Sequence, residues 1–312
     1  MHESLIHGIL KNEHGSISKA VTLIENGGTE IVPLLNNIHE YSTNSVRIGI
    51  TGPPGAGKST ITNALIELFL KNKKTVGVIA VDPTSPFSGG SLLGDRIRMN
   101  HYAWDDRVFV RSMGSNGELG GLARKSQDVG DVLAASGKDV VLYETVGVGQ
   151  SEHDIVKAAD ICIVVLVPES GDEVQMMKAG LIEIADLFVI NKSDREGAGR
   201  LSSMLKNVLH NFNPEGKIEP PVFSTVGTER KGVQKLYKGI FSHLEAMKEL
   251  GYLDKRRLEG YHQRVLALVS ETLEAAFWTD EKIALLNKVS DTSDIVVAPH
   301  AMAQNLMSNE NE

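Results

Sequence analysis

Cysteine is almost absent from this chain of 312 residues, and aromatic residues make up only 5% of it. The single cysteine, Cys162, lies in the apolar run ICIVVLV, which predicts a small buried side chain. One cysteine excludes an intramolecular disulfide and a multi-cysteine metal site. We therefore expect the protein to work in a reducing compartment.

Positive charge is also scarce, because the formal net charge is -8. A general nucleic-acid binder needs a basic face to neutralise phosphates, so we expect no nucleic-acid partner. The first residues show no long apolar stretch or small-residue cleavage site, and no apolar run is long enough to cross a bilayer. We therefore expect a cytoplasmic protein with no membrane partner.

Seven apolar runs alternate with amphipathic segments between residues 45 and 248. Strands this apolar, separated by helices, predict an α/β fold with a mainly parallel sheet covered on both faces. Ligands of such sheets bind at the carboxyl ends of the strands. The runs are VRIGIT, TVGVIAVD, VFVRSM, DVVLYET, ICIVVLV, LFVINKSD and PPVFST.

Helical segments flank this region on both sides. Residues 1–44 carry apolar positions at helical spacing around the turn-like NEHGS, which predicts an N-terminal helical extension. Residues 249–312 contain a long amphipathic segment at 255–278 and a shorter one around 281–288. We expect this C-terminal arm to mediate dimerisation, with a packed appendage as the alternative.

A glycine-rich segment, GPPGAGKST, follows the first apolar run and precedes a helix-like segment. It has the GxxxxGKS pattern of a phosphate-binding loop, in which backbone N–H groups and a helix N-terminus surround one anionic centre. We expect Lys58 to reach the terminal phosphates and the Ser59 hydroxyl to bind Mg²⁺. The predicted nucleotide contacts are Gly52, Pro53, Pro54, Gly55, Ala56, Gly57, Lys58, Ser59 and Thr60.

The tetrapeptide NKSD follows the apolar run LFVI. Its carboxylate can accept hydrogen bonds from the N1–H and the amino group of guanine, whereas adenine offers no such pair of donors. The segment therefore predicts GTP and GDP as ligands. A further base contact, from a backbone N–H, is expected after the last run, where a plain loop is the alternative. The predicted base contacts are Asn191, Lys192, Asp194, Ser224, Thr225 and Val226.

Two acidic residues end apolar runs near the expected phosphates: Asp82, and Glu144 in the motif ETVG. Acids at these positions can bind Mg²⁺ directly or through a water. Many phosphate-loop GTPases carry Gln directly after the glycine of this motif, but here Val148 follows Gly147. We therefore expect slow hydrolysis without a partner. Gln150 lies two residues away from the usual place, which makes it a weaker candidate.

Longer segments extend these motifs, namely VDPTSPFSGGSLLGDRIRM, YETVGVGQSE and VPESGDEVQMMKAGLIEIADLFVINKSD. They resemble the MeaB, ArgK or MMAA family of GTPases, which chaperone adenosylcobalamin-dependent methylmalonyl-CoA mutase. The resemblance extends to SKAVTLIEN and APHAMAQNLM, so it covers nearly the whole chain. It implies a G3E-type phosphate-loop GTPase fold, homodimerisation through the C-terminal arm, and a mutase partner whose cofactor loading, protection and reactivation are gated by GTP.

The resemblance also implies individual roles. Asp82 and Asp95 correspond to acids of a mobile segment, Glu144 to the acid before a second switch, and Gly147 to a nucleotide contact. Residues 169–178 correspond to a switch that contacts the mutase, although an ordinary loop and helix start is the alternative. The implied catalytic residues are Lys58, Asp82, Asp95, Glu144 and Lys178, and the implied Mg²⁺ ligands are Ser59, Asp82, Asp95 and Glu144.

Other functions remain open at this level. The same loop would serve a phosphotransferase, and Val148 would suit a scaffold that binds nucleotide without hydrolysing it. Arg96 and Arg98 are either cationic stabilisers or solvated surface residues. The ten histidines are scattered, unlike the His-rich tract of nickel chaperones that share this motif order. The predicted domains are residues 1–44, 45–248 and 249–312.

Overall fold

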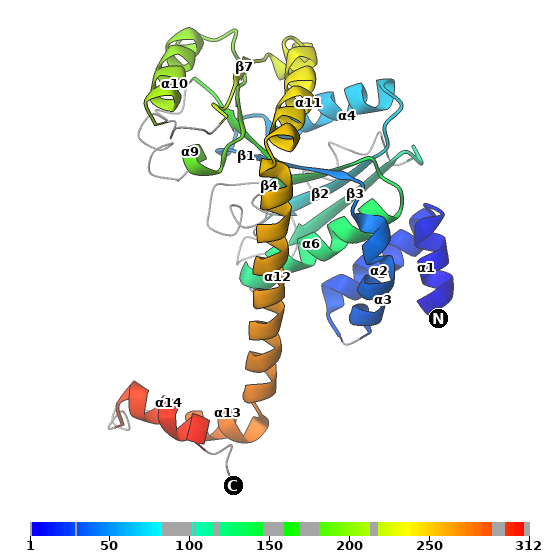
Figure 1. The fold of residues 1–312 in the computed structure, drawn as a ribbon, viewed down its shortest axis with the longest axis vertical. Helices are drawn as coiled ribbons and strands as arrows, with labels where there is room; N and C mark the ends of the chain where they lie inside the picture. Colours follow the sequence, from blue (N-terminus) through cyan, green and yellow to red (C-terminus); the bar gives the residue numbers. More distant parts are fainter. Residues whose placement is uncertain are drawn as a thin grey trace. The chain divides into compact units, whose positions relative to one another are not determined.

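The computed structural model describes residues 2–28, 30–82, 102, 104–114, 119–145, 159–168, 181–212, 218–288 and 297–308. They contain a seven-stranded sheet of order β3-β2-β4-β1-β5-β6-β7 (Figure 1), in which every neighbouring pair is parallel. Each predicted apolar run forms a strand, so the α/β prediction is confirmed. The strands are β1 Val46–Thr51, β2 Val76–Asp82, β3 Val108–Gly114, β4 Val140–Thr145, β5 Ile161–Leu166, β6 Leu187–Ile190 and β7 Val222–Ser224.

Helices cover both faces of the sheet. On one face, α4 (Lys58–Lys71) and α11 (Val233–Glu249) share a core with alternate side chains of the central strands, such as Ile48, Ile50 and Leu142. On the other face, α6 (Leu119–Ala135) packs on β2, β3 and β4, while α9 (Leu181–Ile184) and α10 (Ala198–Phe212) pack on β5 and β6. Burial on both faces explains why the strands are apolar throughout.

The N-terminal segment forms three helices beside α6, as Figure 1 shows: α1 (His2–Leu10), α2 (His14–Asn26) and α3 (Ile31–Ile38), followed by the short η1 (His39–Ser42). The predicted helical stripe Ile17, Ala20, Val21 and Ile24 is fully buried and joins the core under α6. The predicted turn is shorter than NEHGS, because the Ile17 N–H already donates to the Glu13 carbonyl at 3.0 Å and the helix starts at His14.

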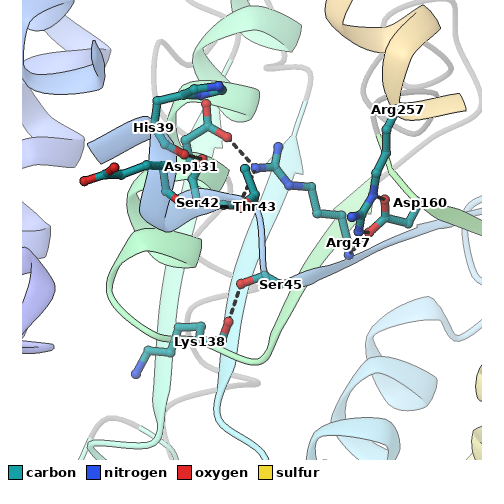
Figure 2. A network of polar contacts seen from close by, with 10 residues as sticks. His39, Ser42, Thr43, Ser45, Arg47, Asp131, Lys138, Asp160 and Arg257 are labelled. Atoms are coloured by element: carbon teal, nitrogen blue, oxygen red, sulfur yellow. Dashed lines mark hydrogen bonds and ion pairs between the residues drawn. The ribbon is translucent and has the colours of Figure 1, made fainter. Parts of the chain in front are cut away.

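A network of ion pairs crosses the amino-terminal edge of the sheet (Figure 2). The largely buried Arg47 guanidinium, at the start of β1, pairs with Asp131 of α6 and donates to the Ser42 carbonyl. The Arg47 N–H donates to Asp160 at 2.8 Å, and Asp160 accepts two further bonds from Arg257, at 2.6 and 2.9 Å. Burial alone would lower the pKa of the Arg47 guanidinium. The electrostatic effects of Tyr143 and Asp131 are larger together, so the pKa of Arg47 is raised.

The chain divides into two compact units, residues 1–257 and 258–312. The division falls inside α12 (Tyr252–Phe277). This helix confirms the long helix expected at 255–278. The helices α13 (Asp280–Leu286) and α14 (Pro299–Ser308) follow it. Among the described residues of the second unit, only Leu306 is buried. No helix in the described ranges combines the length and the apolar character needed to cross a membrane. The predicted functional division at residues 44 and 248 stays a prediction.

Candidate nucleotide-binding site

The glycine-rich loop joins the end of β1 to the start of α4, at the carboxyl edge of the sheet. Gly52 has φ 142°, and a Cβ added there would lie 2.1 Å from the Val165 carbonyl oxygen. Gly57, the residue before α4, has φ 86°, and its Cβ would lie 2.3 Å from Nδ2 of Asn191. Both positions therefore require glycine for backbone conformation and for space.

The Lys58 ammonium lies over its own loop. Its Nζ donates to the carbonyl oxygen of Gly52 at 2.6 Å and to that of Pro53 at 3.0 Å, and the residue is buried. The cation is thus held beside the backbone that the sequence predicts to surround phosphates. It is placed to stabilise negative charge in a partly desolvated setting.

Ser59 and Glu144 come together at the same edge. The Ser59 Oγ donates to Oε1 of Glu144 at 2.5 Å, and Glu144 is 4% exposed at the end of β4. Glu144 stands opposite Ile50 in the parallel register of β1 and β4, which brings it beside the loop. A hydroxyl and a carboxylate are hard oxygen donors, so this pair fits Mg²⁺. Within the described residues, no three His, Cys, Asp or Glu side chains gather at one place, but Mg²⁺ usually needs only one or two carboxylates and keeps several waters.

A buried hydroxyl pair lies next to these groups and was not predicted. The Thr145 Oγ1 donates to the Thr51 Oγ1 at 3.0 Å, and both residues are fully buried. The bond joins the ends of β1 and β4, from which the glycine-rich loop and the ETVG segment begin. Two isolated threonines gave no signal in the sequence.

Asn191 connects the phosphate loop to the predicted base-binding loop. Its Nδ2 donates to the Ala56 carbonyl at 2.9 Å, while its Oδ1 accepts from the Gly227 N–H at 3.0 Å and from the Thr225 hydroxyl at 3.2 Å. Asn191 is 3% exposed, so these bonds form in a desolvated setting. One amide therefore fixes the distance between two loops that nucleotide phosphate and base would contact.

The rest of NKSD lies where β6 ends. Lys192 has φ 55°, a left-handed conformation, and the next N–H, that of Ser193, donates to the Thr225 carbonyl at 3.0 Å. Asp194 is exposed. The pKa of nearby Lys231 is raised, chiefly by its hydrogen bond to Glu229 and also by Asp194. The ion pair of Lys231 is with Glu229 at 2.5 Å, and Asp194 adds only a smaller electrostatic effect.

The end of β7 supplies the remaining base candidates. The Thr225 N–H donates to the Ile190 carbonyl at 2.9 Å, and the Val226 N–H donates to the Lys231 carbonyl at 3.1 Å. These two donors are therefore engaged within the protein. Ser224 is exposed at the last position of the strand.

Several predicted residues fall outside the described part of the chain. The backbone of Asp82 ends β2, but its side chain is not among those described. The remaining predictions in this group concern Asp95, Arg96, Arg98, Gly147, Val148, Gln150 and Lys178, all outside the described residues.

Comparison with known proteins identifies the family. The chain matches the family described as methylmalonyl-CoA mutase-associated GTPase MeaB over residues 17–282. This chain is a member of the MeaB family. It is therefore related to GTPases associated with methylmalonyl-CoA mutase, as the sequence motifs predicted. Membership of a GTPase family implies that the chain binds GTP and GDP.

Two sequences and one crystal structure illustrate how similar this MeaB-family chain is to known proteins. It is 43% identical over 299 residues to a Pyrococcus horikoshii protein, covering 93% of this chain and 94% of that one. It is 30% identical over 299 residues to the mouse protein named methylmalonic aciduria type A homolog, mitochondrial, covering 90% and 72%. A crystal structure named LAO/AO transport system kinase matches with a TM-score of 0.74 and 25% identity, covering 100% and 98%.

Proposed function

We propose that this protein is a Mg²⁺-dependent GTPase that gates adenosylcobalamin loading, protection and reactivation of an acyl-CoA mutase, either methylmalonyl-CoA mutase or a close relative. The observation that carries the nucleotide part is the Asn191 amide, which joins the loop of Lys58 to the loop after β7. The mutase part is supported by the family match over residues 17–282. A reducing, cytoplasmic setting fits the buried thiol of Cys162.

The proposed chemistry is attack of water on the terminal phosphate of GTP. Lys58 and the loop amides would stabilise the charge that develops on the phosphate oxygens. Ser59 and Glu144, with Asp82 and Asp95, would hold Mg²⁺, which supplies further neutralisation of that charge. Lys178 is the proposed partner-sensitive residue. Because Val148 replaces the usual Gln, we expect slow hydrolysis that the mutase stimulates.

A second copy of the chain is the other proposed partner. Large apolar side chains are exposed along α12 in the second unit, including Leu258, Val265, Leu266, Val269 and Leu273. Exposed apolar surface of this extent marks an interaction site. The family resemblance favours a homodimer through this arm.

The test is GTP hydrolysis measured alone and during titration with adenosylcobalamin-dependent acyl-CoA mutases. We expect a low basal rate that one mutase raises by about tenfold or more. Lys58→Ala should lower the stimulated rate by about 100-fold, whereas Lys71→Ala, an exposed lysine in the last turn of the same helix, should leave it unchanged. Full activity of Lys58→Ala would refute the site, and no stimulation by any mutase would refute the gating role.

The name of the structural relative, a transport system kinase, favours a phosphotransferase as the second candidate. GTP labelled on its terminal phosphate separates the two. A GTPase releases all label as inorganic phosphate, whereas a phosphotransferase transfers it to an acceptor. Bound GTP with negligible turnover in the presence of every mutase would instead support a nucleotide-dependent scaffold.

A further inference from the structure

The loop after β7 is tied to α4 by an arginine fork. The Arg230 Nε donates to Oε2 of Glu67 at 2.9 Å, and Nη2 pairs with Oε1 of the same carboxylate. The third arm, Nη1, donates to the Gly227 carbonyl at 3.0 Å. One guanidinium therefore binds a helix on one side and the backbone of the loop on the other, a geometry that the compact ammonium of lysine does not reproduce.

The backbone conformation is adapted to this arrangement. Arg230 has φ 60°, in the left-handed region that favours glycine, and follows the short η3 (Gly227–Glu229). The Arg230 N–H donates to the Gly227 carbonyl at 3.3 Å, and a bridge between Val226 and Lys231 closes the loop. A long charged side chain in a conformation that it rarely adopts indicates that its own contacts hold it there.

Both backbone polar groups of Gly227 are held by side chains. Its oxygen accepts from Arg230, and its N–H donates to Oδ1 of Asn191, whose Nδ2 donates to Ala56 of the phosphate loop. A Cβ added at Gly227 would lie 3.1 Å from a side-chain atom of Ile61 and 3.3 Å from Asn191 Oδ1, so the residue packs closely against α4 and Asn191. The hydrogen bonds thus run continuously from Glu67 through Arg230, Gly227 and Asn191 to the phosphate loop.

We propose that the Arg230–Glu67 pair is a brace: it positions the loop after β7, the predicted base-binding loop, and so sets how long a guanine nucleotide stays bound. The proposal rests on the proposed nucleotide site. Arg230 and Glu67 act through Gly227 and Asn191, so they are positioning residues. Loss of the brace removes the tie between the loop and α4, which weakens the base contacts and leaves Lys58 and the phosphate loop in place.

The experiment measures release of fluorescent GDP from the full chain after addition of excess unlabelled GDP. Arg230→Ala and Glu67→Gln should each speed release by about threefold to fivefold, the range for a partly exposed ion pair. The double variant should release no faster than the faster single variant, because both changes break one interaction. Arg230→Lys should fall between wild type and Arg230→Ala.

Lys235→Ala is the matched control, since this exposed lysine of α11 lies five residues further along the chain. The nucleotide release rate of this variant should equal that of wild type.

Thermal unfolding of every variant shows that it is folded. An ion pair that only supports the fold would lower Tm and leave release unchanged, and this result would overturn the brace. Release rates that multiply in the double variant would also overturn it. If wild type binds no labelled GDP, both the nucleotide site and the brace are refuted, whereas binding with unchanged variant rates refutes the brace alone.

Discussion

We predict that base selection depends on one exposed carboxylate, Asp194, three residues after Asn191 in the NKSD segment. Asp194→Asn replaces an acceptor by an amide whose N–H can donate to the 2-oxo group of xanthine. We expect affinity for GDP to fall by about 100-fold, because the amide keeps one acceptor oxygen for the two guanine donors and turns an NH2 donor toward the other. We expect xanthosine diphosphate to bind instead. Competition titration with GDP and xanthosine diphosphate measures this change in nucleotide preference.

Glu196→Gln provides the control for this change, because it removes an exposed acid two residues away. Its preference for GDP should remain that of wild type. Unchanged GDP affinity in Asp194→Asn would contradict the assignment of this carboxylate to the base.

Lys138 gives a prediction about stability and pH. Its Nζ donates to the Asp106 carbonyl at 2.9 Å, and burial lowers its pKa to about 8, against the opposing effect of Asp106 and Asp105. An unfolded lysine titrates near 10.4, so between about pH 8 and 10 the unfolded chain binds more protons at this group than the folded one. This group therefore makes the folded state more stable as pH rises through that window.

Urea denaturation of wild type and Lys138→Met at pH 7.5, 9 and 10 measures the effect. We expect the free energy of unfolding of wild type, relative to Lys138→Met, to increase across the series. Comparison with the variant is needed because burial raises the pKa of the Cys162 thiol, which lowers wild-type stability with rising pH in the same range. A constant difference between the two proteins would contradict the prediction.

At the scale of elements, the strands were predictable because each is a continuous apolar run buried on both faces. The glycine-rich loop was recognisable because positive φ values and close contacts, with the Val165 backbone at Gly52 and the Asn191 side chain at Gly57, leave few alternatives to glycine. Helix α12 was predictable from its spacing, and the N-terminal stripe was predictable from the same 3.6-residue period. These features depend on local sequence, which a single chain displays directly.

The contacts between elements were not predictable in the same way. Thr145 and Thr51 are 94 positions apart, Asn191 and Ala56 are 135 apart, and Arg230 and Glu67 are 163 apart. Each pairing depends on which elements become neighbours in the fold, and single polar side chains have no periodicity that indicates a partner. Sequence therefore identified the groups of the candidate site but not the bonds that hold the loops together.

The start of α12 shows the same limit. The helix was predictable, but nothing in the run KRR indicated its partners. The fork of Arg256 donates to both carboxylate oxygens of Asp186 at 2.6 and 2.7 Å, and to the Asp160 carbonyl at 2.9 Å. Asp186 also accepts from the Cys162 N–H at 2.7 Å. These pairs fasten the start of α12 to the amino ends of β5 and β6, and bidentate geometry makes them stronger than ordinary surface ion pairs.

At the scale of the whole molecule, the two units differ in how they are stabilised. The first has continuous cores on both faces of its sheet. The second has, among its described residues, one buried side chain, Leu306. Segments with so little buried apolar surface are not stable alone in water, so the second unit is expected to gain its stability by association with another copy.

The apolar side chains of α12 make this expectation testable. Leu258, Val265, Val269 and Leu273 recur at helical spacing and are 56%, 40%, 50% and 65% exposed. Val269→Glu places a charge in the middle of this stripe, and desolvating that charge in an interface costs several kcal/mol (~3 or more). We therefore expect the wild-type chain to be a dimer and the variant a monomer by sedimentation velocity.

Ala267→Glu is the matched control, since Ala267 is exposed and lies about 160° around the helix from Val269. It adds the same charge to the opposite side of α12 and should leave the dimer intact. The basal GTPase rate of both variants should equal that of wild type, because neither residue is among those of the candidate nucleotide site. A monomeric wild type, or a Val269→Glu variant that still sediments as a dimer, would contradict association through this stripe.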